Sequence, residues 1–228
     1  MIERLKRALA SLQDFVWPQK VGCLLCDEFS RGEWLCPACA GELERLRMGC
    51  QTEDVRSAYI YNGCARQLIH ALKYDALYPA AEVMADAMAE TIREMNLPED
   101  TVLTWVTTTR TRQLSRGGDH GRALCQAVAN RVELPMRQLL IRTRSARTQR
   151  GLNARERQTN LRGVFCCREE LRVPVLIVDD VHTTGATLQA CTEALREAGS
   201  PAVYAVTATR VQNGEDPEDE IEMITKGG

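Results

Sequence analysis

The amino-acid sequence predicts an α/β protein with a mostly parallel sheet flanked by helices. Strand-like and helical segments alternate between residues 55 and 208, which is the pattern of parallel strands joined by crossover helices. Residues 173–178 read Val-Pro-Val-Leu-Ile-Val, and a strand without polar side chains fits the buried centre of such a sheet. The 228 residues are 44% hydrophobic and 26% charged, which argues for a globular core and against disorder, collagen-like repeats or a disulfide miniprotein.

Residue periodicity places the elements in order along the chain. Apolar side chains recurring every three or four residues predict helices over residues 2–16, 64–73, 80–96, 119–131 and 186–198. β-branched or alternating apolar residues predict strands over residues 55–61, 101–107, 135–142, 173–178 and 202–208. Residues 20–50 are expected to form a small irregular module, and residues 143–163 a polar, arginine-rich connection.

Charge is distributed unevenly along the chain, although the net formal charge is only −2. Residues 213–228 carry six acids and one lysine, which makes them −5. Residues 104–162 carry thirteen arginines, no lysine and three acids, which makes them +10. Such a stretch is an electrostatic footprint for phosphate, for nucleic acid or for the acidic tail itself. The alternative is a solvated basic helix face, with a few arginines paired to acids elsewhere in the fold.

The sequence carries no sign of export or of a membrane span. No apolar run approaches the roughly 20 residues that cross a bilayer. The first residues, Met-Ile-Glu-Arg-Leu-Lys-Arg, lack the apolar stretch of a signal peptide. We therefore expect a cytoplasmic protein without membrane insertion.

The most specific motif, residues 175–188, reads Val-Leu-Ile-Val-Asp-Asp-Val-His-Thr-Thr-Gly-Ala-Thr-Leu. A buried strand is expected to end at the two acids, and a loop of small residues then opens a helix. Backbone N–H groups and hydroxyls of such a loop can surround a phosphate, helped by the positive end of the helix. The residues expected to bind this phosphate are Thr183, Thr184, Gly185, Ala186 and Thr187.

The two acids before this loop, Asp179 and Asp180, have a different expected role. Carboxylates would repel a phosphate, so they suit sugar hydroxyls or a magnesium ion. A sugar phosphate with vicinal hydroxyls fits the whole motif. The alternative interpretation is a capped strand-to-helix turn with a surface acid pair.

Four of the ten cysteines form two Cys-x2-Cys pairs separated by nine residues. This spacing predicts one tetrahedral zinc ion, and four thiolates would leave no open position, so the ion would be structural. The predicted ligands are Cys23, Cys26, Cys36 and Cys39. Redox-active pairs or unligated core cysteines are the alternatives. No role is assigned to Cys50, Cys64, Cys125, Cys166, Cys167 or Cys191.

The phosphate motif resembles the phosphoribosyl pyrophosphate (PRPP) signature of type I phosphoribosyltransferases. Joined to a four-cysteine module, it resembles the ComF family of bacterial competence proteins, also called GntX-like, over about residues 15–210. Other motifs that match this family are Leu72-Lys73-Tyr74, Arg116-Gly117, Arg142-x-Arg144 with Thr148-Gln149, Arg157 with Asn160, Gly163 and Phe165, and Arg210. The resemblance implies three regions: residues 1–50 with an N-terminal helix and a zinc-ribbon-like module, a phosphoribosyltransferase-like domain over 51–212, and an acidic tail over 213–228.

Two segments depart from the family pattern. Val106-Thr107-Thr108 stands where the family has Pro-Val-Pro, in a loop that contacts pyrophosphate in type I phosphoribosyltransferases. Gly118-Asp119-His120 stands where the family has Phe-Asn-Gln. We expect His120 to be a solvent-exposed substitute in preference to a catalytic base.

The resemblance implies a PRPP-binding protein acting in competence-related DNA uptake. A magnesium-dependent phosphoribosyltransferase would orient the ribose hydroxyls with Asp179 and Asp180. It would hold pyrophosphate with Thr107, Thr108, Arg110 and Lys73. A PRPP sensor without turnover is an alternative. Another is an accessory module that binds single-stranded DNA beside a helicase-like partner, through Arg116, Arg142, Arg144, Gln149 and Arg157. The acceptor base is not identified, and homo-oligomerisation is left open.

Overall fold

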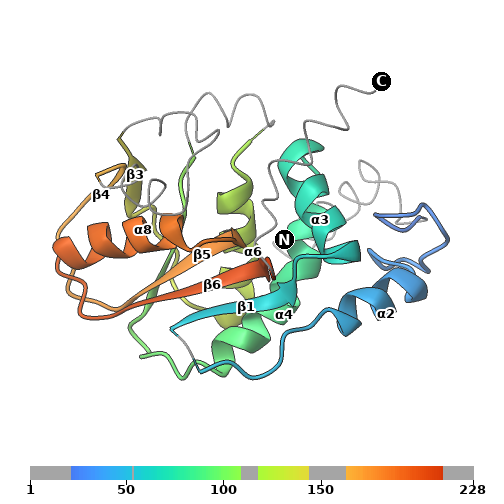
Figure 1. Cartoon of the computed structure of the whole chain (residues 1–228), viewed down its shortest axis with the longest axis horizontal. Helices are drawn as coiled ribbons and strands as arrows, with labels where there is room; N and C mark the ends of the chain where they lie inside the picture. The colour runs from blue at the N-terminus through green and yellow to red at the C-terminus, as the bar shows by residue number, and fades with distance from the viewer. Residues whose placement is uncertain (1–21, 53, 109–117, 144–162, 213–228) are drawn as a thin grey trace, which may run out of the picture.

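A four-stranded parallel sheet forms the centre of the molecule, with the strands in the order β1–β6–β5–β2 (Figure 1). The computed structural model describes residues 22–52, 54–108, 118–143 and 163–212. The four strands are β1 (Val55–Ile60), β6 (Val203–Arg210), β5 (Val175–His182) and β2 (Val102–Trp105). Because β5 and β6 lie between the other two, the motif strand identified from sequence is central.

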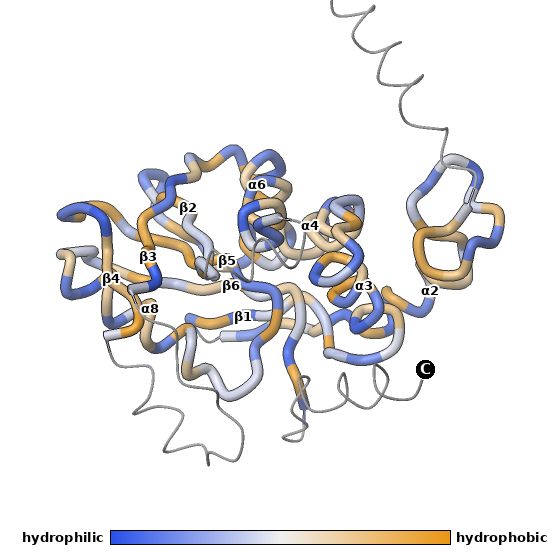
Figure 2. Tube along the Cα trace, turned by 90° about the horizontal axis from the view of Figure 1, so that it is seen from above, coloured by the Kyte–Doolittle hydropathy of each residue, from blue (hydrophilic) through white to orange (hydrophobic). Residues whose placement is uncertain are grey.

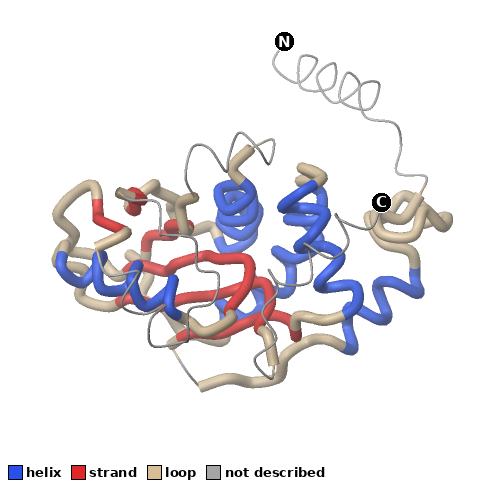
Figure 3. The backbone as a smooth tube through the Cα atoms, turned by 45° about the horizontal axis from the view of Figure 1, so that its top comes forward, coloured by secondary structure: helices blue, strands red, loops and turns tan. Residues whose placement is uncertain are grey.

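Helices cover both faces of this sheet, as the side-by-side blue and red segments of Figure 3 show. One face packs against α3 (Gly63–Tyr74), α4 (Pro79–Arg93) and α6 (His120–Val132), and the other against α8 (Ala186–Glu197). A small antiparallel pair, β3 (Leu140–Arg142) with β4 (Phe165–Cys167), lies beside α8. The predicted α/β class with a mostly parallel sheet flanked by helices is confirmed.

The core has two halves, divided by the sheet. Leu176 and Val178 of β5 join the hydrophobic cluster under α3, α4 and α6. Val175 and Ile177 join the cluster under α8. This alternation follows from the two-residue period of a strand, and it decides which way each later residue of β5 faces.

The cysteine module occupies the end of the molecule opposite β3 and β4 (Figure 2). It contains a turn closed by a bridge between Gly22 and Phe29, followed by α2 (Pro37–Arg45). The sequence predicted no helix here, and this expectation of an irregular module was incomplete. The Cys36 side chain caps α2 by accepting the Cys39 N–H, and Pro37 begins the helix, where its missing N–H has no cost.

β5 is longer than predicted, which corrects the expected end of the strand at Val178. Its pairing with β6 continues through Asp179–Thr207 and Val181–Thr209 to His182, so both acids lie within the strand.

Three predicted segments lie outside the described residues: the helix over 2–16, most of the arginine-rich connection and the acidic tail. No helix in the described part of the chain has the length and apolar character needed to cross a bilayer.

Candidate functional site

The predicted phosphate loop follows β5 at the carboxyl edge of the sheet, where open α/β folds bind ligands. Thr183 and Thr184 are exposed, and Ala186 begins α8. The N–H groups in the first turn of a helix have no partner within the helix. The Ala186 N–H donates to the Thr184 hydroxyl at 3.5 Å, and the exposed Thr183 and Thr184 lie beside the positive end of α8.

Gly185 is the position in this loop where a side chain would be strained and crowded. Its φ of 75° is in the left-handed region, and it forms the N-cap of α8. A Cβ there would come within 3.0 Å of the His182 Nε2 atom. His182 packs beside the loop, and its Nδ1 accepts the Arg210 Nε–H at 2.9 Å.

The two acids of the motif face opposite sides of the sheet. Asp180 follows Leu176 and Val178 in the alternation and points to the side of α3 and α6. Asp179 follows Val175 and Ile177 and points to the side of α8, the helix that the phosphate loop opens. The structure thus leaves Asp179, and not Asp180, on the side of the predicted phosphate site.

Asp180 is held by two cationic or hydrogen-bonding side chains from two helices. The Lys73 Nζ lies 2.9 Å from one carboxylate oxygen, and the His120 Nε2 lies 3.2 Å from the other. Lys73 is in the last turn of α3, and His120 is the first residue of α6. Asp180 is 8% exposed and His120 is 9% exposed, so the expectation that His120 is solvent-exposed was wrong.

The environments of the two acids push their pKa values in opposite directions. Burial and then the charge of Asp180 raise the pKa of Asp179 to about 8. Burial alone would raise the pKa of Asp180, but Lys73 and His120 outweigh it and hold that pKa below its usual range. Burial alone would lower the pKa of Lys73, but the Asp180 carboxylate outweighs burial and raises this pKa above its usual value. Pairs of acids with separated pKa values are typical of functional sites.

The residues predicted to hold pyrophosphate are placed less uniformly. Lys73 is occupied by Asp180. Thr107 is 4% exposed, and its hydroxyl has no hydrogen-bond partner among the described residues. Thr108 is half-buried, and Arg110 lies outside the described residues.

Of the five predicted nucleic-acid contacts, only Arg142 is described. It lies on β3 with its guanidinium 5.4 Å from the centre of the Phe165 ring. Arg116, Arg144, Gln149 and Arg157 lie outside the described residues. Elsewhere in the basic stretch, Arg131 pairs with Glu82 and Asp86 of α4, and Arg137 pairs with Glu169. For these two arginines the alternative interpretation, pairing with acids of the fold, is correct.

The four predicted cysteine ligands form one cluster. Their Sγ atoms all lie within 4.8 Å of one another. Two of the Sγ–Sγ distances are 3.6 Å, between Cys26 and Cys36, and 3.7 Å, between Cys26 and Cys39. A tetrahedral zinc ion with Zn–S bonds of about 2.3 Å requires sulfurs about 3.8 Å apart, so the cluster could hold zinc.

Backbone geometry prepares the first knuckle of this cluster for a thiolate. The chain turns back on itself through Asp27, whose φ is 60°, and the Asp27 N–H donates to the Cys23 carbonyl. Burial raises the pKa of the Cys23 thiol, but neighbouring backbone N–H groups outweigh this and lower it to about 6. Cys23 and Cys36 are buried and Cys26 is exposed, so an ion would be enclosed on the side of the core.

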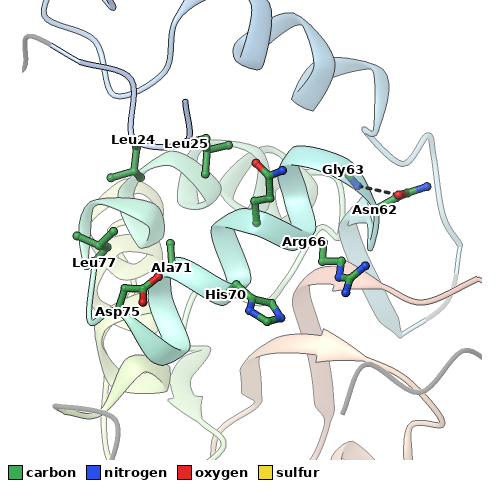
Figure 4. A pocket seen from close by; sticks show the side chains of 10 residues that line it. Leu24, Leu25, Asn62, Gly63, Arg66, His70, Ala71, Asp75 and Leu77 are labelled. Atoms are coloured by element: carbon green, nitrogen blue, oxygen red, sulfur yellow. Dashed lines mark hydrogen bonds between the residues drawn. The ribbon is translucent and has the colours of Figure 1, made fainter. Parts of the chain in front are cut away.

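A cavity of about 550 Å³ lies between the cysteine module and α3 (Figure 4). Leu24 and Leu25 line it from the module, while Arg66, His70 and Leu77 line it from α3 and the turn after it. Burial lowers the pKa of His70. The cavity contains no residue of the phosphate loop and neither acid of the motif.

Sequence reasoning missed the structural roles of Asp119 and His120. Asp119 caps α6 by accepting the Arg122 N–H at 3.0 Å, and it also accepts the Trp105 indole N–H at 3.2 Å. An aspartate just before an amphipathic helix is a usual N-cap signal, so this role could have been predicted. The His120–Asp180 contact joins residues far apart in the sequence, and no local pattern announces it.

The chain is similar in sequence to proteins of named function, although no family model matches it. It is 34% identical to competence protein F of Haemophilus influenzae over 93 residues, which are 39% of this chain and 41% of that protein. It is 31% identical to the DNA utilization protein YhgH of Salmonella typhi, over 60% of this chain and 63% of that protein. The match to YhgH of Escherichia coli is 28% identical over 79% of this chain and 86% of that protein. The chain thus spans less than two thirds of the first two relatives.

Two solved structures that are similar to this chain match it with TM-scores below 0.5. The allosteric regulatory enzyme of purine biosynthesis has a TM-score of 0.42 at 19% identity, over 61% of this chain and 30% of that one. Adenine phosphoribosyltransferase of Leishmania tarentolae has a TM-score of 0.36 at 14% identity, over 59% and 71% of the two chains. The strand order β1–β6–β5–β2 and its parallel connections define the fold. By sequence, the chain is a homologue of competence protein F and of the DNA utilization proteins YhgH.

Proposed function

We propose that the chain is a phosphoribosyltransferase-like protein that binds PRPP at the carboxyl edge of its sheet, in the cytoplasm. The observation that carries the proposal is the loop from Thr183 to Thr187, which joins the central strand to the N-terminus of α8 through a left-handed glycine. A phosphate bound there would accept hydrogen bonds from backbone N–H groups and hydroxyls, so its binding would not require a lysine. This loop would take the 5′-phosphate.

Asp179 and Asp180 would have different roles next to this phosphate. Asp179, on the side of α8, would accept hydrogen bonds from the ribose hydroxyls. It would also be a ligand of a magnesium ion, which prefers carboxylate oxygens. Magnesium would neutralise charge on the pyrophosphate. Asp180, fixed by Lys73 and His120, would hold the end of β5 in place. Because ionisation of a buried acid is disfavoured, a cation beside Asp179 would lower its raised pKa.

The pyrophosphate group of PRPP would bind to Thr107, Thr108 and Arg110. The Thr107 hydroxyl supports this assignment, since it is buried without a partner among the described residues. Lys73 would reach the pyrophosphate only by leaving Asp180. Binding of this kind stabilises charge by position, and it needs no general base in the site.

Cys23, Cys26, Cys36 and Cys39 would hold a structural zinc ion. Their mutual distances and their all-thiolate chemistry fit zinc, and four ligands leave no position for a reacting water. The ion would fix the two knuckles and the start of α2.

A thermal unfolding series with and without ligand tests PRPP binding. A ligand at a hundred times its dissociation constant stabilises the folded state by about 2.7 kcal/mol. We expect PRPP with magnesium to raise the unfolding temperature of the wild type and not that of Gly185→Ala. Gly163→Ala is the matched control, because Gly163 also has a left-handed φ but open space around it. An unchanged wild type would refute the proposal. Pyrophosphate release on adding a nucleobase would identify a transferase, and binding without release a sensor.

The names of the relatives favour a second role, in DNA uptake. Arg116, Arg142, Arg144, Gln149 and Arg157 would then contact the phosphates of single-stranded DNA, beside a helicase-like partner. The affinity would fall with salt, and each lost phosphate contact would lower the salt slope by about one. We expect this for Arg144→Gln and not for Arg137→Gln, because Arg137 pairs with Glu169. A salt slope near zero in the wild type would exclude this role.

A further inference from the structure

A histidine and an arginine join the ends of the two central strands next to the loop that follows β5. His182 is the last residue of β5 and Arg210 the last residue of β6, and the two are partners in the register of the sheet. The Arg210 Nε–H donates to the His182 Nδ1 at 2.9 Å. The Val211 N–H donates to the His182 carbonyl at 3.0 Å, and the Tyr61 N–H donates to the Arg210 carbonyl at 2.8 Å. Both residues are therefore anchored in the sheet.

The contact with Arg210 fixes which nitrogen of the His182 ring carries the hydrogen. A guanidinium group can only donate, so the His182 Nδ1 must accept. A neutral imidazole then carries its hydrogen on the other nitrogen, Nε2, which makes Nε2 a donor. Arg210 thus selects the Nε2–H tautomer of His182.

This donor faces the loop between β5 and α8. A Cβ on Gly185 would lie 3.0 Å from the His182 Nε2, so glycine is the residue that lets the ring and the loop approach each other. The exposed hydroxyls of Thr183 and Thr184 and the first turn of α8 offer further hydrogen-bond donors in the same loop. Donors that gather in one place suit an anion, and the half-buried Arg210 guanidinium adds positive charge at the other ring nitrogen.

We propose that His182 is a positioning residue of the phosphate site, which donates its Nε2–H into the loop at Gly185 and so orients the loop toward the phosphate of a sugar phosphate. Arg210 is the residue that holds His182 in this tautomer. The inference rests on the proposed phosphate binding by the loop from Thr183 to Thr187. Arg210 lies 28 residues after His182, so the spacing of the loop motif does not indicate this pair.

The first test reads the tautomer without any ligand. The chain has three histidines, so long-range proton–nitrogen NMR spectra of the full chain can resolve each ring, and His182→Asn assigns the signal of His182. We expect the Nε2–H tautomer for His182 in the wild type and a mixture of both tautomers in Arg210→Met. The Nδ1–H tautomer in the wild type would overturn the inference, as would an unchanged tautomer in Arg210→Met.

The second test is a calorimetric titration of the full chain with ribose 5-phosphate. His182→Asn keeps an acceptor near the position of Nδ1 but has no atom at the position of Nε2, whereas the amide N–H of His182→Gln reaches that position. We expect His182→Asn to weaken binding about tenfold, the upper end of what one hydrogen bond contributes. His182→Gln should bind within about threefold of the wild type. PRPP with magnesium should show the same ratios, because it carries the same 5′-phosphate.

His70→Asn is the matched control, since it truncates a histidine that lines the cavity beside the cysteine module. It should leave the affinity for ribose 5-phosphate unchanged. Equal affinity of His182→Asn and the wild type would overturn the inference, as would equal weakening by His182→Gln, which would indicate a loss of ring packing only. Weakening for PRPP but not for ribose 5-phosphate would place His182 at the pyrophosphate group and also overturn it.

The failure of this inference is distinguishable from the failure of the proposed function. If the wild type binds neither sugar phosphate while His182 has the expected tautomer, the phosphate site fails and the contact between His182 and Arg210 stands. If the wild type binds both compounds and His182→Asn binds them equally well, the phosphate site stands and the role of His182 fails.

Discussion

The cysteine module and the sheet edge are organised by different forces. In the module, residues 22–46 contribute few fully buried side chains, and four sulfurs converge on one point. At the sheet edge, the loop and the acids extend from strands whose apolar residues are wholly buried, such as Leu176 and Ile177. We therefore expect the sheet edge to form before any ligand arrives, and the module to depend on an ion for its folding free energy.

One helix joins the two regions. Near the start of α3 the Cys64 backbone N–H donates to Glu42 of α2, and in its last turn Lys73 pairs with Asp180. A substitution at one end of α3 should therefore disturb the region at that end and leave the structure of the other region intact.

Metal removal should produce the largest effect, because structural zinc supplies about 10–16 kcal/mol of apparent binding free energy in small zinc modules. We expect the chelated chain to become sensitive to protease within residues 22–46, while β5 and β6 keep slow hydrogen exchange. Limited proteolysis and exchange mass spectrometry measure both. Reloading with zinc should restore resistance, and Cys50→Ser should behave as the wild type because Cys50 is outside the cluster. Equal resistance with and without metal would show that both regions rest on apolar packing.

Breaking the Lys73–Asp180 pair should have the next largest effect. Lys73→Met leaves a buried carboxylate with His120 as its other partner, and loss of one member of a buried pair costs about 3–5 kcal/mol. Urea unfolding measures the change. Arg137→Met, which breaks an exposed pair with Glu169, should cost less than about 1 kcal/mol. If the two variants lost similar amounts of unfolding free energy, the Lys73–Asp180 pair would not be what holds the sheet edge in place.

Much of this arrangement was predictable, and the misses have physical causes. The parallel sheet, the loop between β5 and α8 and the clustering of four cysteines follow from apolar runs and spacing. The end of β5 was misplaced because aspartate is rare in strands, although pairing with Thr207 and Thr209 extends the strand through both acids. That error hid their opposite orientations. α2 was missed because cysteine is not a usual N-cap, and the burial of His120 depends on Asp180, a distant residue.

Asp179 and Asp180 should respond to pH with opposite signs. A raised pKa keeps folded Asp179 protonated while the unfolded chain ionises, so stability falls as pH rises from about 4 toward about 8. Asp179→Asn removes this loss, and the variant should be more stable than the wild type at pH 8 and equal to it near pH 4. Asp180 has a lowered pKa, so its stabilisation is present at neutral pH and disappears as pH falls below about 4.

Denaturation curves at pH 4, 6 and 8 measure both variants. Asp180→Asn should be destabilised at pH 8 and approach the wild type only in acid. The same sign for both substitutions at pH 8 would contradict the opposite orientations of the two side chains. A stabilising substitution at Asp179 is the pattern expected of a residue kept for a ligand at a cost in stability.

The most direct test of the account is a calorimetric titration of the zinc-loaded full chain with PRPP and magnesium. The account predicts saturable binding of one PRPP per chain, lost in Gly185→Ala, kept in Gly163→Ala and weakened in Asp179→Asn. Absence of binding heat in the wild type at several temperatures, or equal binding by Gly185→Ala, would contradict the claim that the loop after β5 is a phosphoribosyl site.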